Sequence, residues 1–142
     1  MDIGRKRVTL HDGGEKVVTG STTNFIARCV GAVVRMDPKT TKNRRIRISE
    51  VMYSEKGMLR ALEEVTGEKW EVKETSTDLL LAEGREAGAR GDMRSFYLGH
   101  ILKLNFDGEG AAFFEGLSFG DELVERRSFK DIVKTAVLAE SD

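Results

Sequence analysis

The segment that decides the fold runs from residue 7 to residue 25, Arg7-Val-Thr-Leu-His-Asp-Gly-Gly-Glu-Lys-Val-Val-Thr-Gly-Ser-Thr-Thr-Asn-Phe25. Val8 and Leu10 alternate with polar residues, and a second apolar pair, Val17-Val18, follows the Asp-Gly-Gly turn. Because glycine adopts positive φ at little cost, this pattern predicts a β-hairpin over residues 7–19.

Helical and strand-like patterns alternate along the first half of the chain, and the second half is helical. The predicted helices are Phe25–Val34, Ser54–Gly67, Thr77–Arg90, Asp92–Asn105 and Ser128–Glu140, and the further strands are Arg45–Met52 and Lys69–Thr75. This order predicts an α/β protein, or α+β in isolation, with a small sheet, an N-terminal hairpin and a helical cap. No shift in composition marks a boundary, so residues 1–142 are predicted to form one domain.

Composition restricts the partners and the compartment. The chain has 23 Lys and Arg against 24 Asp and Glu, a net charge of −1 that gives no general attraction to nucleic acid. The densest basic stretch, residues 39–47, has no interleaved aromatic residues. There is no run of about 20 apolar residues and no secretory leader, and Cys29 is the only cysteine. We therefore expect no nucleic acid, no membrane, and a cytoplasmic protein.

Two glycine motifs resemble known catalytic or binding turns but lack the required context. Gly116-Leu-Ser118-Phe-Gly120 matches a nucleophile elbow, yet no strand precedes it and both histidines lie upstream, so a loop is predicted. Gly84, Gly88 and Gly91 lie in a charged helical stretch with no strand before them. They are interpreted as a helix end and turn rather than a dinucleotide fingerprint.

Histidine and aromatic residues give the candidate binding site. Phe96 and Tyr97 lie about one helical turn before His100, so aromatic faces and a titratable ring can line one cleft. His11 is interpreted as a surface residue or a hydrogen-bonded interior one. The dispersed Cys and His residues give no zinc-type spacing, so no metal is expected.

Several phrases together resemble the C-terminal half of the NmrA-like family, which includes the isoflavone-reductase-like proteins and belongs to the atypical short-chain dehydrogenases. The phrases are Lys42-Asn-Arg-Arg-Ile-Arg-Ile-Ser49, Ala61-Leu-Glu-Glu-Val-Thr-Gly67 and Glu68-Lys-Trp-Glu-Val72. Thr9 to Val34 is similar to the family's late hairpin and helix. Gly91 to Gly110 is similar to its substrate-side helix and loop, and residues 122–137 to its terminal helix.

The resemblance implies an NADPH-dependent oxidoreductase that reduces small aromatic or polyketide-like metabolites. Phe96, Tyr97 and His100 are then the expected substrate-binding residues, with the rings stacking on substrate and His100 forming a hydrogen bond. The family's glycine-rich turn and its catalytic lysine have no counterpart here. We therefore expect a truncated Rossmann fold, no cofactor for this chain alone, and no catalytic residue that can be transferred.

Two other functions stay open. The chain could be a non-catalytic regulatory module that binds a ligand or a partner protein, as a homo-oligomer or beside a complementing chain. It could also be a cofactor-free isomerase or cyclase with Tyr97, His100, Asp92 and Glu109 as acid–base groups.

Overall fold

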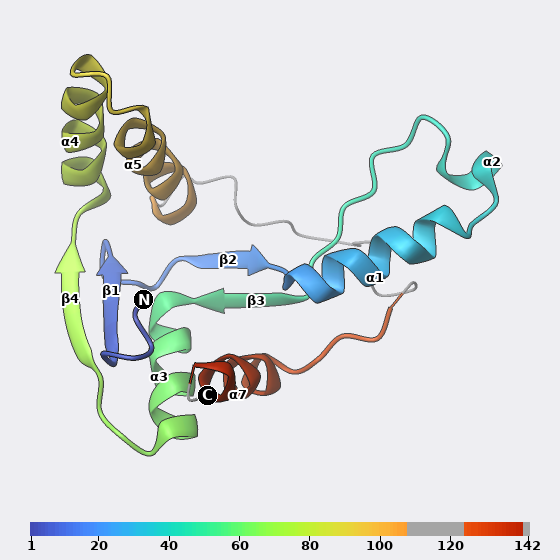
Figure 1. Ribbon diagram of the computed structural model, residues 1–142, viewed down its shortest axis with the longest axis horizontal. Coiled ribbons are helices and arrows are strands. Elements are labelled where there is room, and N and C mark those ends of the chain that lie inside the picture. Colours follow the sequence, from blue (N-terminus) through green and yellow to red (C-terminus); the bar gives the residue numbers. More distant parts are fainter. Residues whose placement is uncertain (108–123, 141–142) are drawn as a thin grey trace.

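A computed structural model describes residues 1–107 and 124–140 of the chain (Figure 1). Helices and strands are mixed, as predicted for an α/β protein. In chain order they are β1 (Arg7–His11), β2 (Val17–Gly20), α1 (Thr23–Val34), α2 (Pro38–Thr41), β3 (Val51–Ser54), α3 (Glu55–Thr66), β4 (Glu71–Thr75), α4 (Thr77–Ala89), α5 (Met93–Phe106) and α7 (Phe129–Ala139). None of the helices in these residues is long and apolar enough to cross a bilayer.

The strands form two separate pairs, and the predicted hairpin is wrong. β1 pairs in parallel with β4, from Arg7 opposite Glu71 to His11 opposite Thr75, while β2 pairs antiparallel with β3. The turn itself exists, since Asp12, Gly13 and Gly14 all have positive φ. However, Gly14 packs directly on Leu10, where a Cβ would lie 3.0 Å from the Leu10 Cδ2. After the turn the chain enters β2, which runs away from β1 and pairs with β3 (Figure 1).

The predicted strand Arg45–Met52 is also shifted. The observed strand, β3, covers Val51–Ser54, because its partner β2 has only four residues and the ladder ends at Gly20 opposite Val51. Residues before Glu50 have no neighbouring strand to pair with among the described part of the chain.

Residues close to the helix ends cap several of the helices. Thr22, Ser54 and Ser128 each accept a hydrogen bond from a backbone N–H in the first turn of α1, α3 and α7. Gly67 ends α3 with φ of 68°, the left-handed conformation that glycine tolerates best.

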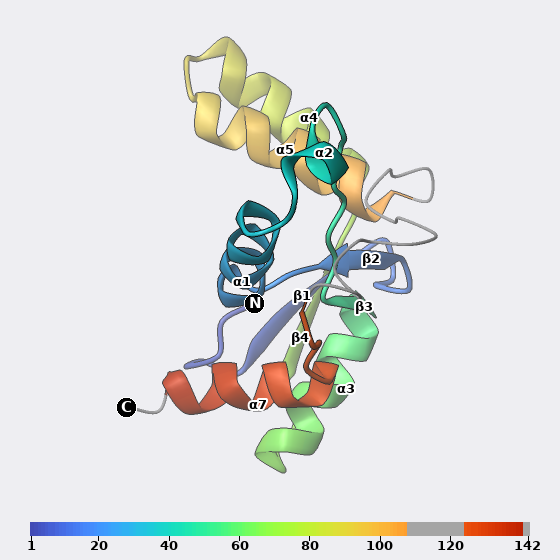
Figure 2. The same ribbon diagram turned by 90° about the vertical axis from the view of Figure 1, so that its right-hand side faces the viewer.

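The core lies between the β1–β4 pair and helices α3 and α7, which cross and pack against each other (Figures 1 and 2). The buried members are Val8, Leu10, Leu62, Trp70 and Val133. Burying one large apolar side chain contributes about 1.5–3 kcal/mol, so this cluster supplies much of the stability.

Helices α4 and α5 form a pair that projects from the core (Figure 2). Their close contact depends on glycine, because a Cβ at Gly99 would lie 2.5 Å from the Leu80 carbonyl oxygen. Gly84 and Gly88 face α5 in the same way, and only Gly91, with φ of 89°, occupies a turn. The interpretation as a helix end and turn is therefore correct for Gly88, the last residue but one of α4, and for Gly91, while Gly84 lies inside α4.

Candidate functional site

The carboxyl ends of β1 and β4 meet at one edge, because the two strands are parallel. In open α/β sheets ligands bind at this edge, outside the ends of the strands. The residues that follow the two strands, and the C-terminal part of α5, bring several charged and aromatic side chains together here. This edge is the first candidate site.

Asp12 holds the N-terminus of α4 at this edge. Its Oδ1 accepts the Thr77 backbone N–H at 3.0 Å, and its Oδ2 accepts the Thr77 hydroxyl. The hydroxyl bond is the main cause that holds the pKa of Asp12 below its usual value, and Lys103 adds to it. Asp12 is therefore an anion whose role is to anchor α4.

His11 lies beside Asp12 with only 9% of its surface exposed. Its backbone N–H donates to Glu55 Oε2 at 2.7 Å, and its Nδ1 lies 2.6 Å from Glu55 Oε1. The imidazole stacks on Phe106, with ring centroids 5.1 Å apart and an angle of 10°. The sequence predicted a surface or hydrogen-bonded interior residue and missed this pairing, which spans 44 residues.

Lys103 connects α5 to the same edge. Its Nζ lies 2.8 Å from both Asp107 Oδ2 and Asp78 Oδ1. Hydrogen bonds to Asp107 and then Asp78 raise the pKa of Lys103, so it remains a cation at neutral pH.

The three predicted substrate residues lie together on α5. The Phe96 ring contacts Tyr97 edge-on at 5.4 Å and His100 at 4.2 Å between centroids. His100 Nδ1 lies 2.7 Å from the Phe96 carbonyl oxygen, so Nδ1 carries the hydrogen and Nε2 is an acceptor when the ring is neutral. Tyr97 is exposed. Their binding of substrate stays a prediction.

A groove of about 410 Å³ lies between α4 and α5, but none of these three residues lines it. Its walls include Leu80, Leu98 and Leu102, and its rim includes Glu83 and Asp92. Asp92, one of the predicted acid–base groups, caps α5 and binds Ser95, which lowers its pKa. Tyr97 and His100, two other predicted acid–base groups, are on α5. Glu109, the last of these groups, and Ser118 of the glycine motif lie outside the described residues.

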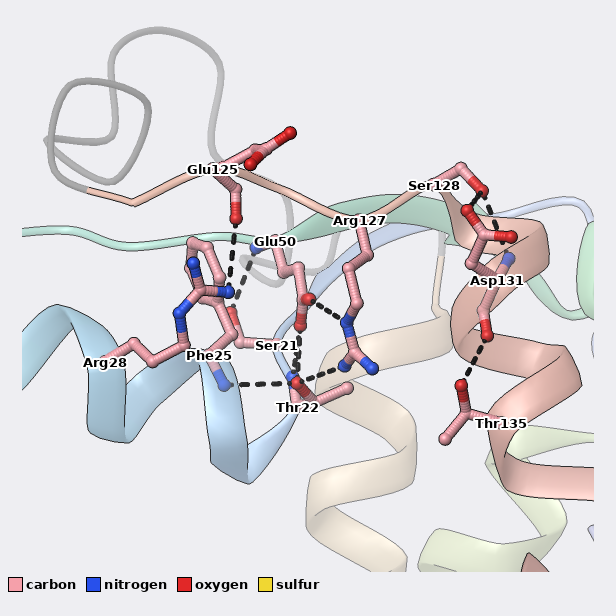
Figure 3. A network of polar contacts seen from close by, with 10 residues as sticks. All are labelled: Ser21, Thr22, Phe25, Arg28, Glu50, Glu125, Arg127, Ser128, Asp131 and Thr135. Atoms are coloured by element: carbon pink, nitrogen blue, oxygen red, sulfur yellow. Dashed lines mark hydrogen bonds and ion pairs between the residues drawn. The ribbon is translucent and has the colours of Figure 1, made fainter. Parts of the chain in front are cut away.

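A buried ion pair joins α1 to the segment before α7 (Figure 3). Glu50 accepts the Thr22 backbone N–H at 3.0 Å, and its Oε1 lies 3.2 Å from Arg127 Nε. Burial opposes ionisation of Glu50, but the bonds from Thr22 and Arg127 prevail and its pKa is lowered. No local pattern predicts this contact, because Glu50 and Arg127 are 77 residues apart.

The fold of this chain resembles part of the fold of a solved reductase and of a solved epimerase. The triphenylmethane reductase of Citrobacter sp. complexed with NADP(H) matches 94% of this chain and 45% of its own, with a TM-score of 0.67 and 17% identity. A nucleoside-diphosphate-sugar epimerase from Staphylococcus aureus matches 93% of this chain and 44% of its own, with a TM-score of 0.61 and 18% identity. These identities establish the fold alone.

A sequence relative points to oxidoreductases. The oxidoreductase poxI of Penicillium oxalicum is 28% identical over 112 residues, which are 79% of this chain and 35% of poxI. The chain thus spans about a third of this curated relative and under half of the solved structures. No protein-family model matches the sequence.

One sequence-based expectation needs correction. We expected no cofactor for this chain, whereas the Citrobacter structure that shares its fold is complexed with NADP(H). The expectation rested on the missing glycine-rich turn alone, and a structure with this fold that is complexed with NADP(H) contradicts it.

Proposed function

We propose that this chain is the substrate-side region of an NADP(H)-dependent reductase of small aromatic compounds, of the NmrA-like, isoflavone-reductase-like type. The observation that carries the proposal is the aromatic cluster Phe96, Tyr97 and His100 on α5, in a fold shared with a triphenylmethane reductase. The match to poxI supports the oxidoreductase class. A cytoplasmic location stays a prediction.

The described helix ends do not fit the pyrophosphate of NADP(H). Such a group binds free backbone N–H groups at a helix N-terminus. At α1 the Thr22 N–H already donates to Glu50, and at α4 the Thr77 N–H already donates to Asp12. α3 begins with a carboxylate, Glu55, that holds His11. Because these carboxylates would repel phosphate, we assign the phosphates to none of these three ends, and no step is derived through the cofactor.

The aromatic cluster can bind and orient a flat substrate. Phe96 and exposed Tyr97 offer ring faces and edges, and aromatic pairs contribute about 0.5–1.5 kcal/mol beyond their buried area. His100 Nε2 can accept a hydrogen bond from the substrate, because Nδ1 is held by the Phe96 carbonyl.

Dye binding tests the proposal. We expect crystal violet, a triphenylmethane dye, to bind the chain, and Phe96→Leu and His100→Ala each to weaken binding by about two- to tenfold. The absorbance change of the dye on titration with each protein measures dye binding, and NADPH oxidation in the presence of the dye tests reduction. Leu79→Ala, an exposed position on α4, is the matched control. Equal binding by all four proteins would contradict the assigned site, and absence of dye binding by the wild type would contradict the aromatic class of substrate. NADPH oxidation in the presence of the dye would support the reductase class.

A second proposal, that the chain binds a protein partner, rests on α1. Ile26, Val30 and Val34 are spaced by four residues, form a stripe along one side of the helix, and are all exposed. We propose that a second copy of the chain covers this stripe, because a net charge of −1 leaves little repulsion between copies.

A further inference from the structure

The groove between α4 and α5 has apolar walls that are open to solvent. Its described lining residues all lie between residues 80 and 102, on the two helices and in the turn at the outer end of the pair (Figure 1). Leu80 from α4 and Leu98 from α5 contribute apolar surface, and Leu98 is 53% exposed. The volume of about 410 Å³ falls in the range of small-molecule sites, about 300–1,000 Å³. A ligand in this groove would therefore bury apolar surface that the chain leaves in water.

The rim of the groove carries more negative than positive charge. Its charged lining residues are three carboxylates, Glu83, Glu86 and Asp92, and one guanidinium, Arg90. Arg90 lies 3.9 Å from Glu86, and the two side chains are 71% and 75% exposed, so this ion pair is weak. Glu83 makes no ion pair with any described residue. Apolar walls below a negative rim complement a molecule that joins an apolar body to a positive group.

The same carboxylates oppose anions. Glu83 and Glu86 are three residues apart on one side of α4, so a phosphate or carboxylate held between them would meet like charges. The predicted substrate residues Phe96, Tyr97 and His100 do not line the groove. The groove is therefore separate from the proposed substrate residues, and its charge selects for cations.

We propose that the groove between α4 and α5 binds a lipophilic organic ammonium ion. The alkyl chain of the ligand packs on Leu80, Leu98 and Leu102, and its ammonium group lies at the rim beside Glu83. The contact is noncovalent. The proposal goes beyond the proposed function and does not rest on it, because neither the aromatic cluster nor a nucleotide takes part.

The test compares three probes with the same eight-carbon chain: octyltrimethylammonium, 1-octanol and octanoate. Each probe is titrated into the full chain, and the ¹H–¹⁵N NMR shifts of the Gly84 and Gly99 amides report binding in the groove. We expect octyltrimethylammonium to bind about fivefold more tightly than 1-octanol, and octanoate to bind most weakly. Added salt should weaken binding of the cation and leave that of 1-octanol unchanged.

Two variants separate the charge of the groove from its apolar walls. Glu83→Gln should weaken binding of octyltrimethylammonium about two- to fivefold and leave 1-octanol unchanged. Glu74→Gln, at an exposed glutamate on β4, is the matched control. Leu98→Ala should weaken binding of both probes about two- to tenfold. Leu104→Ala, at a similarly exposed leucine of α5 that does not line the groove, should change neither.

Three results would overturn the proposal: octanoate binding as tightly as octyltrimethylammonium, no shift of the Gly84 and Gly99 amides, or an equal loss of binding in Glu74→Gln and Glu83→Gln. Binding of an amphipathic peptide of Leu and Lys, with none of octyltrimethylammonium, would also overturn it and identify the groove as a docking site for a helix. Circular dichroism and thermal unfolding check the fold of each variant. A failed dye assay leaves these expectations unchanged, because the dye assay tests the aromatic cluster alone.

Discussion

At the scale of single residues, the sites of this protein depend on carboxylates that hold distant parts of the chain together. Glu50, Asp12 and Glu55 each bind the backbone or side chain of a residue far away in the sequence. A buried carboxylate is stable only while its partners remain, because removing one partner leaves an uncompensated charge. Glu50 has the most complete set of partners, and its side chain is fully buried.

Arg127→Ala should therefore destabilise the protein by about 2–3 kcal/mol, less than for a fully buried pair, because the Arg127 side chain is 35% exposed. Glu50→Gln, which leaves no buried charge, should cost less. Urea unfolding followed by Trp70 fluorescence measures both. A larger loss in Glu50→Gln than in Arg127→Ala would contradict this account.

The same carboxylate predicts a pH dependence. The pKa of Glu50 is lowered in the folded protein from its usual 4.5, so its contribution to stability is present above about pH 4.5 and is lost as the pH falls through the folded value. In Arg127→Ala one cause of the lowered pKa is gone, and we expect the acid unfolding transition to move to higher pH.

At the scale of elements, glycine decides how closely α4 and α5 approach. Gly99 and Gly84 bring the two backbones into contact, and the bond from Lys103 on α5 to Asp78 on α4 depends on that distance. Helix propensity favours alanine over glycine by about 1 kcal/mol, so only the packing requires glycine here.

Gly99→Ala should destabilise the protein by about 1–3 kcal/mol, because its Cβ would lie 2.5 Å from the Leu80 carbonyl oxygen and the helices must separate. Gly31→Ala is the matched control, since it lies inside α1 and its Cβ would meet only Arg35, at 3.8 Å. This control should be neutral or up to about 1 kcal/mol more stable. Thermal unfolding of the two variants measures the contrast, and an equal effect would refute the packing argument.

At the scale of the whole molecule, two small strand pairs and the core between β1, β4, α3 and α7 leave α1 incompletely covered. α1 buries Phe25 and Cys29 but exposes its other apolar side. Cys29 is buried and its pKa is raised by that burial, so the thiol stays protonated at neutral pH.

If a second copy of the chain covers the stripe of Ile26, Val30 and Val34 on α1, the protein is a dimer. We expect light scattering after gel filtration to give the mass of a dimer. Val30→Asp should convert it to a monomer, because an aspartate in the contact costs several kcal/mol of desolvation. Val72→Asp, an exposed valine on β4, is the control and should leave the dimer intact. A monomeric wild type would favour a complementing chain as the occupant.

The sequence by itself determined the features that depend on neighbours within about four residues. The caps at Thr22, Ser54 and Ser128, the end of α3 at Gly67 and the approach of Phe96 to His100 are all local. The tertiary structure alone decided which strands pair, since β1 joins β4 across 64 residues while the adjacent β2 joins β3. It also decided the pairing of His11 with Glu55 and of Glu50 with Arg127. The physical reason is that strand ladders and buried charges pair groups that lie far apart in the sequence and meet only in the folded chain. No periodicity along the chain indicates which groups will meet.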